Sequence, residues 1–211
     1  MRVVVVVGLC TALLAGSVAG ANAAKTYAGV KGGVNIAELT GDDVPDGQSS
    51  RNGFMGGGFF LFDFAEGFGV CIEGLYVQKG AEGPFETEDG DTHDATVRLD
   101  YLEFPVLFVV EIPGKNKLGV NLFAGPTFGF NLKGEVEIPE HGETEDLAVK
   151  SFEFGASIGG GIEYALSSFS IVVDGRYSIG ATLIDDSPNE ADIKNRGIGI
   201  MAGVKFPLGA H

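Results

Sequence analysis

The sequence is short of the residues that would support a disulfide framework, a membrane-spanning helix or a nucleic-acid surface. It has two cysteines, Cys10 and Cys71, and three histidines in 211 residues. After its first residues, no apolar run reaches the length of about 18 residues that a transmembrane helix needs. Lys and Arg total 14 against 29 Asp and Glu, a formal net charge of −15. This charge argues against nucleic acid as a partner, because phosphate backbones attract basic surfaces.

The start of the chain has the pattern of a cleaved secretion signal. Arg2 is positive, residues 3–14 are mostly apolar, and Ala21-Asn22-Ala23 has the small-x-small form of a signal-peptidase site. We therefore predict a signal peptide over residues 1–23 and one domain over residues 24–211. A membrane anchor is the alternative, but the apolar run is short for one. Cleavage would remove Cys10 and leave Cys71 alone, so no internal disulfide is expected.

The stretch from Leu118 to Lys133 alternates between apolar and polar residues. Every second residue from Leu118 to Leu132 is apolar, and the intervening residues are polar or small, with Phe123 as the exception. Period-two alternation places the two sets on opposite faces of a β-strand. Ordinary strands have about five or six residues, whereas a tilted membrane strand needs about 9–11. The length and the apolar face therefore predict a strand that lies against a lipid bilayer.

The same alternation recurs and predicts eight strands. They cover approximately residues 25–39, 53–64, 68–80, 96–112, 118–133, 151–166, 169–180 and 196–208. Long polar loops at 40–51, 81–95, 134–150 and 181–195 come after the odd-numbered strands, and short turns come after the second, fourth and sixth. This pattern is typical of outer-membrane barrels, which have short periplasmic turns and long external loops. We predict an all-β fold, an eight-stranded antiparallel up-and-down transmembrane β-barrel in the cell outer membrane, with both termini periplasmic.

The two faces of the predicted strands differ in a way that favours a membrane barrel over a soluble, lipocalin-like one. The apolar face has bulky Phe, Leu, Ile and Val with almost no charge, as lipid contact requires. Eight strands enclose only enough space for packed side chains, so we expect an ion-paired plug inside rather than a pore. The polar face carries Lys31, Glu73, Lys79, Glu103, Lys133, Glu153, Glu163, Asp174, Arg176 and Lys205.

Several segments together resemble one family. They are Gly29-Val30-Lys31-Gly32-Gly33-Val34-Asn35, residues 73–80 (Glu-Gly-Leu-Tyr-Val-Gln-Lys-Gly), Tyr101-Leu102-Glu103-Phe104-Pro105 and Phe123-Ala124-Gly125-Pro126. In this order they resemble the PorT-like outer-membrane β-barrel proteins. The resemblance implies an eight-stranded barrel of the OmpA/OmpX type and, through the founding member, a link to protein secretion. It supplies no catalytic residues. The chain departs from the family pattern in its acidic loops and in ending on Gly209-Ala210-His211.

The histidines give little support for an enzyme. His93 and His141 lie in predicted loops and His211 ends the chain, so no serine or cysteine nucleophile has a histidine at matching depth in the strands. A loop-sited hydrolase built on His93 with Asp94, or on His141 with Asp146, stays open as an alternative. We nevertheless predict a non-enzymatic protein that needs no cofactor.

The acidic stretch over residues 88–94 superficially resembles a calcium loop. It lacks the later glycine and the terminal glutamate of an EF-hand, so a solvated loop is the plain alternative. We take Asp89, Asp91 and Asp94 as a hypothetical site for loose binding of divalent cations. Such cations could bridge the loops, or link them to lipopolysaccharide.

The functional prediction is a surface interaction or an envelope-structural role. Outer-membrane lipid and lipopolysaccharide are the expected partners, with divalent cations and a surface or secretion-machinery protein as further candidates. A part in protein secretion across the outer membrane is the second interpretation, and the loop-sited hydrolase is the third.

Overall fold

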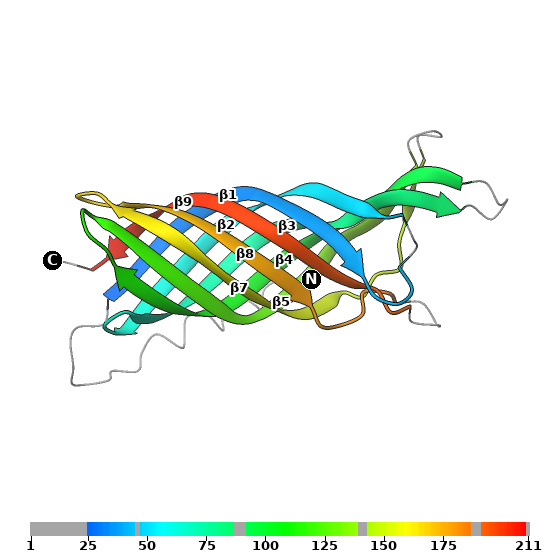
Figure 1. Ribbon diagram of the computed structural model, residues 1–211. Coiled ribbons are helices and arrows are strands. Elements are labelled where there is room, and N and C mark those ends of the chain that lie inside the picture. The colour runs from blue at the N-terminus through cyan, green and yellow to red at the C-terminus, as the bar shows by residue number, and fades with distance from the viewer. Residues whose placement is uncertain (1–24, 45–46, 87–91, 139–142, 187–190, 210–211) are drawn as a thin grey trace, which may run out of the picture.

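The computed structural model describes residues 25–44, 47–86, 92–138, 143–186 and 191–209. Within these residues nine strands form, and eight of them close into an antiparallel barrel (Figure 1). The predicted fold class is therefore confirmed. No helix in the described ranges is long and apolar enough to cross a membrane. The strands are β1 (Lys25–Thr40), β2 (Ser49–Ala65), β3 (Phe68–Glu86), β4 (Thr92–Pro113), β5 (Leu118–Ile138), β6 (Glu143–Asp146), β7 (Phe152–Ala165), β8 (Ser170–Gly180) and β9 (Lys194–Leu208).

Each barrel strand pairs with its neighbours in the order β4-β3-β2-β1-β9-β8-β7-β5, and pairing of β4 with β5 closes the ring. The short connections after β2, β4 and β7 gather at one end, where β1 also begins and β9 ends (Figure 1). We call this the turn end, and the opposite end the loop end. Closure leaves no edge strand within the barrel wall, which a sheet surrounded by lipid requires.

Two hairpins extend beyond the wall at the loop end. β3 and β4 remain paired from Gly83↔Ala95 to Glu86↔Thr92, and the end of β5 pairs with the short strand β6. The prediction of loops over 81–95 and 134–150 was therefore wrong for much of both segments. The apolar alternation stops where contact with lipid would stop, but backbone hydrogen bonding continues through polar residues. We call these extensions the β3–β4 hairpin and the β5–β6 hairpin.

The outer face of the wall is apolar up to three ion pairs near the loop end. Val34, Phe60 and Ile158 are each more than half exposed, as residues that contact lipid should be. Toward the loop end, Glu38 pairs with Arg196 at 2.8 Å. Further outward pairs join Arg98 to Glu137 and Lys133 to Glu135.

Lys133 corrects one sequence prediction, because it does not belong to the inner face. Its side chain is 52% exposed. A register shift lies between Asp100, which pairs with Lys133, and Tyr101, which pairs with Asn131. The extra residue on β5 reverses the parity of the later residues of that strand, as a β-bulge does.

Candidate functional site

The inner face of the barrel carries charged and apolar levels in alternation. Along β3 the inward residues run, from the turn end, through Cys71, Glu73, Leu75, Val77 and Lys79, and all five are buried. Charged residues on the other strands meet Glu73 or Lys79, or form a third level nearer the turn end. Nine of the ten predicted inner charges lie inside, and Lys133 is the exception.

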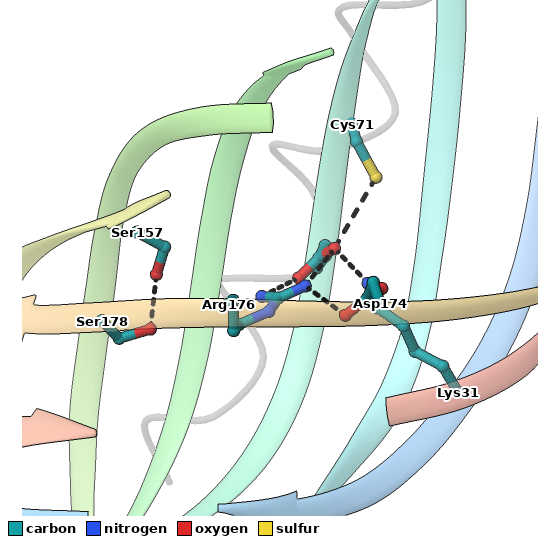
Figure 2. A network of polar contacts seen from close by, with 7 residues as sticks. Lys31, Cys71, Ser157, Asp174, Arg176 and Ser178 are labelled. Atoms are coloured by element: carbon teal, nitrogen blue, oxygen red, sulfur yellow. Dashed lines mark hydrogen bonds and ion pairs between the residues drawn. The ribbon is translucent and has the colours of Figure 1, made fainter. Parts of the chain in front are cut away.

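The middle charged level is centred on Glu73. Both guanidinium Nη atoms of Arg176 donate to its carboxylate, at 2.7 and 3.1 Å, and Lys31 donates to it at 2.6 Å. Lys31 also donates to Asp174 at 2.8 Å. Figure 2 shows Lys31, Asp174 and Arg176 converging in the lumen. Bidentate, charge-assisted contacts of this kind compensate for removing the charges from water.

The charged level nearer the loop end is centred on Lys79. Its ammonium lies 2.6 Å from Glu103 and 2.7 Å from Glu153. Asn195 donates to the second oxygen of Glu153 at 2.5 Å. The Tyr101 ring packs against the ammonium, with 4.8 Å between its centroid and Nζ. Every member of this level is buried.

The third charged level lies near the turn end and is centred on Lys205. The ammonium contacts Glu111 at 3.0 Å and Glu163 at 2.5 Å, and the Tyr27 ring lies 4.6 Å away. Glu111 and Glu163 are partly exposed, unlike the carboxylates of the other two levels. This level therefore faces an open space.

Apolar clusters separate the charged levels. One cluster joins Phe59, Leu61, Cys71, Leu107, Val109 and Phe123, and a second joins Met55, Leu75, Val77 and Met201. Phe123, the exception in the alternation of its strand, is thus a lumen residue. Glycines make room for the large rings: a Cβ atom at Gly159 would lie 2.6 Å from the Phe123 ring. Cys71 is buried in the first cluster, as expected of a filler, but its thiol also donates to Oε1 of Glu73 at 3.9 Å (Figure 2).

Segments between the strands cover the loop end of the lumen. Ile184 is buried against Leu99 and Tyr101, and its carbonyl accepts a hydrogen bond from the Lys150 amide at 2.8 Å. An isolated bridge joins Val149 to Asp185. We call residues 147–150 and 181–186 the loop-end cap. The sequence signal for it was a short apolar run in each of two polar loops, Leu147-Ala148-Val149 and Leu183-Ile184.

The turn end instead holds a cavity of about 860 Å³. Its floor is the Lys205 level, and Tyr27, Asp63 and Asn121 complete the inner wall. A further space of about 50 Å³ lies deeper, among the Phe59–Phe123 cluster. We call the larger cavity the vestibule.

The residues predicted for cation binding are not placed by the structure. Asp89 and Asp91 lie outside the described residues, and of Asp94 only the backbone is described, opposite Pro84 in the β3–β4 hairpin. His141 and His211 are also outside, and the side chain of His93 is not described. The cation site and the loop-sited hydrolase therefore remain predictions, as does the signal peptide over residues 1–23.

Comparison with known proteins identifies the family. Residues 22–185 match the model of the outer membrane protein beta-barrel domain. The chain belongs to this family. Membership places the barrel in the outer membrane, as predicted. No protein with a curated description matches the sequence.

Two solved structures share the fold at low sequence identity. Neisserial surface protein A (NspA) matches with a TM-score of 0.54 and 11% identity, over 88% of this chain and 99% of its own. OprG from Pseudomonas aeruginosa matches with a TM-score of 0.52 and 11% identity, over 88% and 97%. These likenesses concern the architecture of the barrel.

Proposed function

We propose that this barrel is a non-enzymatic, non-conducting outer-membrane protein that binds a partner through the hairpins at its loop end. The observation that carries the proposal is the contrast between lumen and loop end. Ion pairs and apolar clusters occupy the lumen between the vestibule and the loop end, where Ile184 covers it. The β3–β4 and β5–β6 hairpins extend past the wall instead. Binding at the hairpins needs no passage through the barrel.

The hairpins carry an excess of carboxylates. Glu145 and Asp146 are exposed on the β5–β6 hairpin, and Glu82 is exposed at the base of the β3–β4 hairpin. The connecting residues 87–91 and 139–142 add further acidic residues. Such a surface favours a partner with a basic face, and the attraction speeds their encounter. The proposal therefore assigns the hairpins a basic protein surface, with divalent cations as bridges to lipopolysaccharide.

A shortened hairpin tests the proposal. Glu82 and Thr96 are directly paired, so residues 83–95 can be replaced by Asn-Gly, the usual two-residue hairpin turn. In lipid nanodiscs, the parent barrel should bind poly-L-lysine and not poly-L-glutamate. The shortened barrel should bind poly-L-lysine more weakly than the parent does. A matched variant keeps the length but replaces the Asp and Glu residues of 82–94 with Asn and Gln. Undiminished binding by both variants, or channel conductance by the parent in planar bilayers, would contradict the proposal.

The proposal requires the loop end to face outward and both ends of the barrel domain to be periplasmic. A glutamyl-specific protease applied to intact cells should cut within residues 81–95 or 134–150. Trypsin should cut after Lys115 or Lys117, in the turn between β4 and β5, only once the cells are opened. Cleavage of that turn in sealed cells would show that the barrel has the opposite orientation.

The resemblance to PorT-like proteins supports a second candidate, an accessory role in protein secretion. Its site would be the turn end, and the vestibule is the feature that favours it. The two candidates can be distinguished by experiment. Shortening the β3–β4 hairpin should leave secretion intact if the turn end carries the secretion role.

A further inference from the structure

The vestibule is built from the last residues of four strands. Asp63 lies two residues before the end of β2, Glu111 two before the end of β4, and Glu163 two before the end of β7. Lys205 lies near the end of β9 and joins Glu111 to Glu163. The inward parity of these strand ends places all four side chains around one cavity of about 860 Å³, a volume within the usual range for small-molecule sites.

The floor of the vestibule has more negative than positive charge. Three carboxylates, from Asp63, Glu111 and Glu163, line the floor together with the one ammonium of Lys205. That ammonium is already engaged by two of them. Asp63 lines the same cavity and adds a further negative charge. The excess of carboxylates over ammonium groups makes the floor suited to a group that carries positive charge.

The rim of the vestibule has the opposite balance and an apolar flank. Lys25 and Lys117 line it, against Glu66 as the acidic residue there. The backbone of Lys117 is fixed, because its carbonyl accepts a hydrogen bond from the Ala165 amide at 2.8 Å. Beside it, Ile112 and Leu118 also line the cavity and are about half exposed on the lipid-facing side of the wall.

These three features together select a ligand that is cationic at one end, anionic next to it, and apolar beyond. A simple anion would be repelled by the carboxylates of the floor. A single metal ion fits poorly, because no three Asp, Glu, His or Cys side chains among the described residues come together to hold one. A phospholipid headgroup that ends in a primary ammonium has the required order of groups.

We propose that the vestibule binds the headgroup of an ethanolamine phospholipid. The ammonium lies between Asp63 and Glu111, which both line the cavity, and its positive charge offsets theirs. The phosphate lies at the rim beside Lys117, and the acyl chains run past Ile112 and Leu118 along the outside of the wall. The site is independent of the loop-end function and of the orientation of the barrel.

A lipid titration tests this site directly. Short-chain (dihexanoyl) phosphatidylethanolamine is added to the barrel in detergent micelles, and backbone amide shifts are monitored by NMR. We expect saturable shifts at Asp63, Glu111, Lys117 and Asn121. The choline lipid, whose quaternary ammonium cannot donate, and the glycerol lipid, which has no ammonium, should bind at least about tenfold more weakly.

Variants separate the headgroup site from general lipid contact. The double variant Asp63→Asn with Glu111→Gln should bind the ethanolamine lipid at least about tenfold more weakly. Its affinity for the choline lipid should be unchanged. Lys117→Gln removes the phosphate partner alone. Asn121→Phe fills the cavity without changing its charge and covers the case in which the carboxylate variant does not fold. Glu38→Gln with Arg196→Gln, a pair at the loop end, is the matched control and should bind normally.

Three results would overturn the proposal. Equal affinity for the ethanolamine and choline lipids would show that the ammonium protons are not used. Shifts that the carboxylate variant and Asn121→Phe both leave intact would place binding elsewhere. Equal affinity for glycerophosphoethanolamine, which lacks acyl chains, would make the ligand a soluble phosphoethanolamine rather than a lipid.

Discussion

Glu73 illustrates how single residues hold the lumen together. The residue is 2% exposed, and its carboxylate accepts hydrogen bonds from both Lys31 and Arg176. A buried ion pair adds little net stability compared with apolar residues of the same volume, but removing one partner leaves an uncompensated charge. Glu38, in contrast, pairs with Arg196 on the outer surface. Loss of an ion pair should therefore reduce stability more at Glu73 than at Glu38.

Glu73→Gln should lower the free energy of unfolding by about 3–5 kcal/mol, the usual cost of breaking a buried pair. Glu38→Gln should cost less than about 1 kcal/mol, as is usual for exposed pairs. Urea unfolding of both variants in lipid vesicles, monitored by the shift of the folded band on gels, measures the difference. Similar losses for the two would mean that the Glu73 level is hydrated.

In the turn between β4 and β5, Lys117 has a backbone conformation that is unfavourable for lysine. Asn116 and Lys117 have φ values of 60° and 68°, and the Leu118 amide donates to the Lys115 carbonyl at 3.2 Å. These are the features of a type I′ turn, for which Asn-Gly is the preferred pair. Lysine in the left-handed region costs about 1–2 kcal/mol.

Lys117→Gly should therefore stabilise the barrel by about 1 kcal/mol, less any loss of chain entropy. Lys115→Gly is the control, because φ is not positive there, and it should be neutral or destabilising. The same urea unfolding assay reports both. A loss of stability on Lys117→Gly would show that the lysine side chain makes contacts that outweigh the strain.

At the scale of elements, the sequence was sufficient to find all eight wall strands, because lipid on one face and a packed lumen on the other enforce period-two alternation. It failed where that constraint ends. β3 and β4 continue into their hairpin, and β6 (Glu143–Asp146) is entirely polar. The bulge near Tyr101 that turns Lys133 outward has no sequence signature. Alternation thus reports lipid contact better than it reports strand ends.

Depth in the membrane gives a test of the outer face. Ile158, paired with Ala124 and Tyr177, lies near mid-strand, and Leu118 is the first residue of β5. Both are exposed on the outside of the wall. Ile158→Arg should cost about 2–4 kcal/mol and Leu118→Arg about 0–1 kcal/mol, because the penalty for a charge falls from the midplane to the interface. Equal tolerance of both, measured by folding into vesicles, would argue against a bilayer at this depth.

At the scale of the molecule, parity correctly placed nine of the ten charges that were predicted to lie inside, but it did not predict which of them meet. Lys31 and Asp174 are 143 positions apart in the chain, yet they lie 2.8 Å apart. Their meeting depends on the shear of the closed barrel, which no local pattern encodes. The loop-end cap and the vestibule escaped prediction for the same reason, because each is assembled from segments that only closure brings together.

Closure also gathers the acidic connections at one end. The described parts of residues 81–95, 134–150 and 181–195 lie at the loop end. These three segments supply much of the formal charge of −15. Like charges within the Debye length of about 8 Å at physiological ionic strength repel one another. Divalent cations that bridge carboxylates would reduce this repulsion, with weak sites of this type binding at about 10⁻⁴–10⁻³ M.

Millimolar Ca²⁺ should therefore slow cleavage of the loop-end connections by a glutamyl-specific protease, while circular dichroism shows unchanged strand content. Replacing Asp89, Asp91 and Asp94 together with Asn should weaken this protection, because these residues are the proposed ligands. The control is NaCl at equal ionic strength, which screens charge without bridging it. Equal protection by NaCl and Ca²⁺ would mean that screening alone acts on the loops, and the cation site at Asp89, Asp91 and Asp94 would then be wrong.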